Sequence, residues 1–119
     1  MPRYVLVNRF REGQGPVEGS PAHDDEMRDW GLFNKSLSDS GDLVWSLALD
    51  DVQHATACTS DERGRPVRLS GRDATPEGMF ALYLVEVADA SAAEQWAARM
   101  PTAAYGAVEV RAVMSEEHG

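Results

Sequence analysis

Residues 79–87 carry apolar side chains on both faces of the strand that they are expected to form. In an extended chain, successive side chains point to opposite sides, with Met79, Ala81, Tyr83, Val85 and Val87 on one side and Phe80, Leu82 and Leu84 on the other. Residues 4–7 show the same pattern in a shorter run. Strands that are apolar on both faces are normally buried on both. The chain is therefore expected to build a sheet that is covered on both sides.

The order of the expected elements limits the fold further. Helical spacing predicts helices from about residue 23 to 40 and, opening with a capping box at Ser91 and Glu94, over residues 91–100. Strands are predicted at residues 4–7, 43–49, 54–59, 66–69, 79–87 and 107–113. Right-handed crossovers then place both helices on one face of one sheet. We predict a single α+β domain over residues 1–119, a ferredoxin-like subunit with an added β-hairpin.

The second face of this sheet needs a cover that two short helices cannot supply. A second copy of the chain, packed sheet to sheet, would provide it. We therefore predict a homodimer through the open sheet face, with an interface of roughly 800 Å² per subunit. The alternative is that the loops at residues 11–22 and 70–78 fold over that face.

Charge and composition exclude several classes of partner. The 11 Lys and Arg against 20 Asp and Glu give a net charge of −9, spread evenly over both halves of the chain. Such a field repels phosphate backbones and anionic lipid, so we expect no nucleic-acid or membrane partner. With no targeting segment, no apolar run of about 20 residues and the single cysteine Cys58, a cytoplasmic protein is expected. There is no phosphate loop or dinucleotide fingerprint, so we expect no cofactor.

The C-terminal third resembles the YCII-related family, in its DGPF-motif branch. The resemblance is carried by residues 82–87 (LYLVEV), 94–101 (EQWAARMP) and 105–111 (YGAVEVR). It implies a dimeric α+β barrel of ferredoxin-like subunits with a cleft between sheet and loops. It also implies that some relatives are small cofactor-free enzymes that use a His–Asp pair. The Asp-Gly-Pro-Phe motif of the family is replaced here by Ser70-Gly71-Arg72-Asp73, in which only Gly71 is retained.

His23 is the leading candidate for chemistry. It lies at the junction of a long loop and the first helix, in a Pro21-Ala22-His23 sequence that resembles the "PAH" of the other YCII branch. A histidine can act as a general base near neutral pH, and Asp73 from the second loop is the carboxylate expected to orient it. The alternative is an exposed or capping histidine. The run from His23 to Glu26 resembles a set of metal ligands, but neighbouring side chains on a helix diverge, so no metal site is expected.

Four further residues are predicted to bind a ligand. Trp45 would form a stacking wall or fill a void, and Arg72 would meet an anionic or carbonyl group or remain solvated. His54 would line the same cleft or lie half exposed on a strand. Tyr83 completes this predicted set of ligand contacts.

The sequence supports two functions. The first is a small cofactor-independent enzyme that abstracts a proton from an organic substrate, aromatic or polyketide-like, and causes elimination, isomerisation or cyclisation. The second is a non-catalytic protein of the same fold that binds a ligand or has an accessory, regulatory role.

Overall fold

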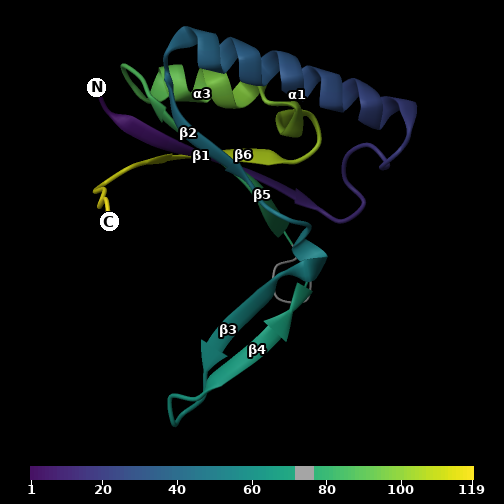
Figure 1. Cartoon of the computed structure of the whole chain (residues 1–119), viewed down its shortest axis with the longest axis vertical. Coiled ribbons are helices and arrows are strands. Elements are labelled where there is room, and N and C mark those ends of the chain that lie inside the picture. The colour runs from purple at the N-terminus through teal and green to yellow at the C-terminus, as the bar shows by residue number, and fades with distance from the viewer. Residues whose placement is uncertain (72–76) are drawn as a thin grey trace.

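The computed structural model describes residues 1–71 and 77–119 and has an α+β fold (Figure 1). Its main body is a four-stranded antiparallel sheet in the order β2-β5-β1-β6 with α1 and α3 on one face. The strands of this sheet are β1 (Arg3–Arg11), β2 (Leu43–Ala48), β5 (Glu77–Glu86) and β6 (Ala107–Ala112). The helices are α1 (Pro21–Ser40) and α3 (Ala90–Arg99), with short 3-10 turns η1 (Val52–His54) and η2 (Pro101–Ala104). A separate hairpin consists of β3 (Thr56–Ser60) and β4 (Pro66–Ser70).

Helix α1 begins and ends where its sequence provides caps. Ser20 is the N-cap, and its Oγ accepts a hydrogen bond from the N–H of His23 at 3.2 Å. Pro21 occupies the first helical position, so the helix starts two residues earlier than expected. Gly41 ends the helix with a left-handed φ of 81°. These caps fix His23 in the first turn of α1.

The start of α3 differs from the sequence expectation. Asp89, rather than Ser91, is the N-cap, and its carboxylate accepts a hydrogen bond from the N–H of Ala92 at 2.9 Å. The predicted capping box at Ser91 is therefore wrong. An aspartate two residues earlier satisfies the same free N–H groups and interacts favourably with the helix dipole.

The core lies between the two helices and the sheet. Leu6, Leu37, Val85 and Ala93 are fully buried there. Aromatic rings extend this core along α1, where Trp30 stacks on Tyr83 at a centroid distance of 6.1 Å. These aromatic contacts therefore continue the core from its middle toward the N-terminal end of α1.

A β-bulge in β5 changes which side chains face the helices. Asn8 of β1 is opposite Ala81, but the next residue of β1 is opposite Met79, so Phe80 is the extra residue. Phe80 consequently packs against the core on the helix side, in edge contact with Trp30 at 6.3 Å. The expectation that Phe80 shares a face with Leu82 and Leu84 is wrong, because strict alternation ends at the bulge.

The face of the sheet away from the helices is partly bare. Leu84 and Val7 lie on this face and are only 4% and 7% exposed within a single copy of the chain. Trp45 and Leu47 of β2 lie on the same face and are 43% and 40% exposed. The exposed apolar surface is therefore concentrated along the edge strand β2.

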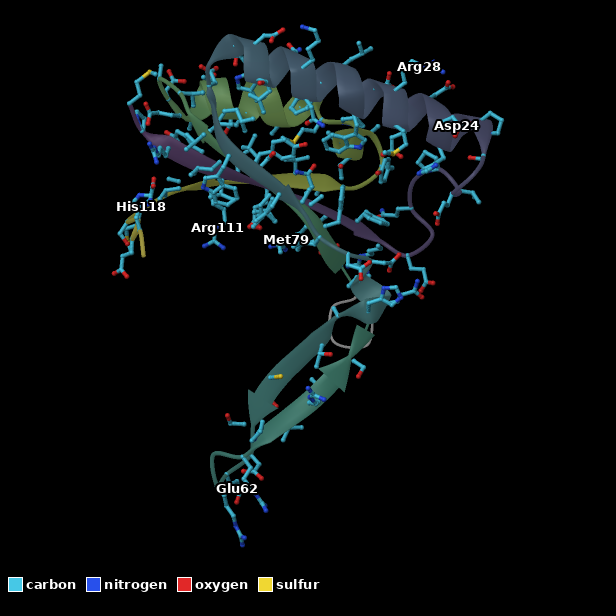
Figure 2. All side chains as sticks on the ribbon, in the orientation of Figure 1. Asp24, Arg28, Glu62, Met79, Arg111 and His118 are labelled. Atoms are coloured by element: carbon cyan, nitrogen blue, oxygen red, sulfur yellow. The ribbon has the colours of Figure 1, made fainter. Side chains whose placement is uncertain are left out.

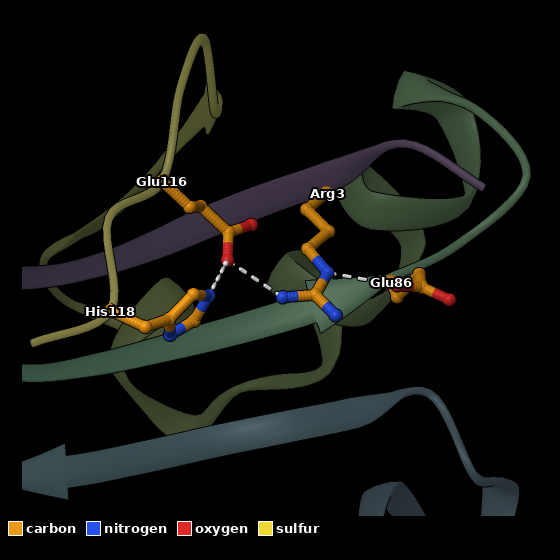
Figure 3. Close-up of polar contacts among 4 residues, drawn as sticks. All are labelled: Arg3, Glu86, Glu116 and His118. Atoms are coloured by element: carbon orange, nitrogen blue, oxygen red, sulfur yellow. Dashed lines mark hydrogen bonds and ion pairs between the residues drawn. The ribbon is translucent and has the colours of Figure 1, made fainter.

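The C-terminal tail is held to the beginning of β1 by ion pairs (Figure 3). Arg3 contacts Glu86 at 2.8 Å and Glu116 at 2.7 Å, and His118 lies 3.6 Å from Glu116. The hydrogen bond from Arg3 is the main cause that holds the pKa of Glu86 below its usual value. None of the helices in the described parts of the chain is both long and apolar enough to cross a membrane.

Candidate functional site

A cavity of about 310 Å³ opens beside the first turn of α1. Figure 2 shows this end of the helix, where Asp24 is labelled. The cavity is bounded by the loop before α1, the end of β1, the bulge of β5 and the residue after η2. Its lining combines acid–base side chains (Glu18, His23, Glu26, Asp51, Tyr105) with apolar ones (Phe10, Pro16, Met27, Trp30, Phe80). The fold thus places titratable groups against an aromatic wall.

His23 reaches this cavity from the first turn of α1. Its Nδ1 accepts a hydrogen bond from the N–H of Gly19 at 3.4 Å. A neutral imidazole that accepts at Nδ1 carries its proton on Nε2. In this geometry the ring is therefore a hydrogen-bond donor at Nε2, and it would have to release the long bond from Gly19 to accept a proton at Nδ1.

Glu26 and Tyr105 form a second polar pair on the cavity wall. The Tyr105 hydroxyl donates a hydrogen bond to Oε1 of Glu26 at 2.5 Å. Glu26 lies one turn after His23, so both project from the same face of α1. Burial, followed by the neighbouring Glu26 carboxylate, raises the pKa of Tyr105 above its usual value, so its hydroxyl stays protonated. The pair therefore keeps a hydrogen-bonded carboxylate beside the histidine.

The loop before α1 is pressed against Tyr105 at one glycine. Gly15 has a φ of 82°, and a Cβ added there would lie 2.7 Å from Cε2 of the Tyr105 ring. Only a residue without a side chain fits both the backbone conformation and this contact. Gly15 therefore lets the loop close one side of the cavity.

An aromatic wall forms another boundary of the cavity. Phe10 contacts Phe80 with a centroid separation of 5.3 Å and Tyr105 at 6.0 Å, both edge to face. Phe80 in turn contacts Trp30. Such edge contacts hold the rings at defined angles and leave an apolar, polarisable surface for an organic ligand.

Two of the predicted ligand-binding residues, Trp45 and Tyr83, do not lie at the cavity of His23. Trp45 lies on the open face of the sheet, away from the helices. Tyr83 is buried under α1 and donates to Oδ1 of Asn34 at 2.5 Å, and burial raises its pKa. Neither side chain lines the cavity. Both positions follow from the sheet, which points alternate residues to opposite faces.

His54 occupies a neighbouring depression. It belongs to η1 rather than to the strand expected over residues 54–59, and its Nδ1 lies 3.2 Å from Oδ2 of Asp50. The N–H of Asp51, followed by His54, lowers the pKa of Asp50. The depression around His54 shares the residue Asp51 with the cavity of His23.

Arg72 and Asp73 lie outside the described residues. The predicted orientation of His23 by Asp73, and the predicted ligand contact of Arg72, therefore stay predictions. Among the carboxylates of the described residues, none is hydrogen-bonded to the His23 ring, whose recorded partner is Gly19.

Sequence reasoning missed most of the cavity wall. The sequence analysis treats Glu26 only as the end of a run that resembles metal ligands, and it includes Tyr105 only within residues 105–111. Tyr105 meets Glu26 across 79 positions of the chain. The available signal was the spacing of three residues between His23 and Glu26, which predicts one shared helix face.

A model of the YCII-related domain matches residues 3–117. No curated protein matches the sequence. In the described parts of the chain, no three His, Cys, Asp or Glu side chains are grouped as a metal site.

Proposed function

The chain belongs to the YCII-related domain family, and on this premise we propose that it is a small cofactor-independent enzyme that abstracts a proton from an organic substrate. The observation that carries the proposal is the cavity that joins His23, Glu26 and Tyr105 to a wall of aromatic rings. Proton transfer needs an acceptor that lies within hydrogen-bonding reach of the substrate in a site of suitable size. An aromatic or polyketide-like molecule suits the wall, and elimination, isomerisation or cyclisation would follow from loss of its proton.

The proposed base is His23. On binding, a substrate C–H group would replace the Gly19 N–H at Nδ1, which accepts only a 3.4 Å bond in the free protein. The imidazole would take up the proton and become positively charged. The Glu26 carboxylate, one turn away on the same face of α1, would stabilise that charge. In this proposal Glu26 is a carboxylate partner of His23 in addition to Asp73, whose role stays a prediction.

Proton abstraction can be tested without knowing the natural substrate. Aryl ketones and polyketide-like 1,3-diketones are incubated with the protein in D₂O, and exchange of their C–H protons is followed by NMR. A positioned general base contributes about 100-fold or more, so His23→Ala should reduce the exchange rate by that factor. His54→Ala is the matched control, because its side chain is 63% exposed and lies outside the cavity. Undiminished exchange in His23→Ala would contradict the mechanism.

A non-catalytic ligand-binding protein is the second candidate. It is favoured by the Gly19 bond, which in the free protein occupies the nitrogen that a base would use. The two candidates differ in an NMR titration of the three histidines, where His54 and His118 serve as exposed internal references. A His23 signal that responds to the same compounds while no C–H exchange occurs would favour the binding role.

We also propose that the subunit is ferredoxin-like, in the DGPF-motif branch of the family, and pairs into a dimeric α+β barrel. The strand order and the position of both helices on one face support the subunit fold. The exposed apolar side chains of Trp45 and Leu47 support a homodimer through the open sheet face.

A further inference from the structure

The β3–β4 hairpin, residues 56–70, is an arm that has little cover from the rest of the chain. Its two strands pair only with each other, and within it only Ala57 and Asp61 are even half buried. A two-stranded hairpin alone is marginally stable in water at best. The structure therefore contains an ordered arm whose stability calls for a partner surface.

The arm has two different sides. Because opposite residues of an antiparallel pair share a face, Leu69 lies beside Ala57, and Val67 lies beside Thr59. This side is apolar, with Val67 and Leu69 40% and 46% exposed. The other side carries Thr56, Cys58, Ser60, Arg68 and Ser70. A one-sided apolar strand pair is typical of a sheet that packs against a surface.

The charge of the arm is opposite to that of the remaining chain. Residues 56–70 hold three Arg and two acids, a net charge of +1. The other residues hold 8 bases and 18 acids, a net charge of −10, which sums with the arm to the −9 of the chain. A second copy of this chain therefore presents an acidic surface to a mildly basic arm.

Direction and area also indicate a second copy. The arm leaves the body on the side of the sheet opposite to the helices, which is the open face (Figure 1). The chain exposes 8040 Å², whereas a compact monomer of its mass exposes about 6,300 Å². Its radius of gyration is 16.3 Å, against about 13.5 Å for a compact domain of this length. The excess area is larger than the roughly 800 Å² that each subunit of a standard interface buries.

We propose that the arm packs its apolar side, with Val67 and Leu69, onto a second copy of the chain. The inference rests on the homodimer proposed above and adds the surface that holds it together. A copy seated on the open sheet face lies on the side to which the arm extends. Each arm then embraces the partner, and its apolar side chains are removed from water.

Two variants that carry the same charge test the arm. Leu69→Glu places a carboxylate on the apolar side, and Ser60→Glu places one on the polar side. Both positions are exposed in a single copy, so neither change disturbs the fold of the subunit. In sedimentation equilibrium, Leu69→Glu should raise the dimer dissociation constant by roughly 100-fold or more, because the two arms of a symmetric dimer each lose one buried leucine. Equal dissociation constants for the two variants would overturn the proposal.

Thr59 lies beside Val67 on the apolar side of the arm, so a probe at this position measures directly what that side touches. A photoreactive maleimide is attached to the thiol of the ¹⁵N-labelled double variant Cys58→Ser, Thr59→Cys, which is mixed with unlabelled protein and irradiated. Mixed-mass cross-links to residues of the second copy support the proposal, and exclusively intrachain cross-links overturn it. If Trp45→Glu dissociates the dimer while Leu69→Glu does not, the proposed contact of the arm is contradicted. The homodimer through the open sheet face is then still supported. A monomer at micromolar concentration would overturn both.

Discussion

The contact between Gly15 and Tyr105 yields a prediction with a built-in control. Gly13 and Gly15 lie in the same loop with nearly equal φ values, 86° and 82°. A Cβ at Gly13 would meet nothing within 4 Å, whereas a Cβ at Gly15 would lie 2.7 Å from the Tyr105 ring. Gly13→Ala and Gly15→Ala therefore change the backbone equally and differ only in the contact with Tyr105.

The expected magnitudes follow from this geometry. The left-handed backbone costs a non-glycine residue about 1–2 kcal/mol. Reduced entropy of the unfolded chain offsets this by roughly 0.4–1 kcal/mol. Gly13→Ala should thus lower the free energy of unfolding by about 1 kcal/mol. Gly15→Ala should lower it by a further 1–3 kcal/mol or so, the usual cost of overpacking against a ring that cannot move freely.

Urea unfolding at one fixed protein concentration measures both variants. Repeating both substitutions in a Tyr105→Ala background removes the ring, and there Gly15→Ala should cost no more than Gly13→Ala. If Gly13→Ala and Gly15→Ala lower the free energy of unfolding equally in the wild-type background, the reasoning is refuted. This result would mean that the loop yields and that Gly15 does not hold the wall of the cavity.

Three further predictions test the helix start, the phenol and the sheet face. Asp89→Ala should lower the free energy of unfolding by about 1 kcal/mol and Ser91→Ala by less than half of that, because Asp89 is the N-cap; thermal or urea unfolding distinguishes them. The pKa of Tyr105 is raised in the folded chain, so its contribution to stability is full below about pH 10 and is lost as the pH rises further. Between about pH 9 and 11, the urea midpoint should fall less steeply with rising pH in Tyr105→Phe than in the wild-type protein. Trp45→Glu should convert the proposed dimer to a 13.0 kDa species in sedimentation, and an unchanged mass would contradict the pairing.

Local signals in the sequence predicted most of the elements. The helix from about residue 23 to 40 was predicted from its helical spacing, and the structure places α1 there with two additional residues at its start. The hairpin was predicted from its turn composition, although the first strand begins later than expected because η1 takes up Val52–His54. These features depend on neighbouring residues, and a single sequence contains that information.

The features that the sequence did not reveal depend on residues far apart in the chain. The bulge at Phe80 results from pairing between β1 and β5, and strict alternation cannot show it. For the same reason the meeting of Glu26 with Tyr105 was not predicted. His23 was identified because a histidine at a loop-to-helix junction is a local signal. Its partners could be identified only once the sheet had brought η2 beside α1.

The bulge also changes the argument for a second copy. With Phe80 on the helix side, the open face is less apolar than the sequence indicates, and Leu84 and Val7 are already buried within one subunit. The exposed apolar surface that a second copy would bury lies mainly along the edge strand β2, at Trp45 and Leu47. The arm is joined to this same strand through η1. An interface that follows β2 and the arm therefore explains the exposed surface better than one spread evenly over the sheet.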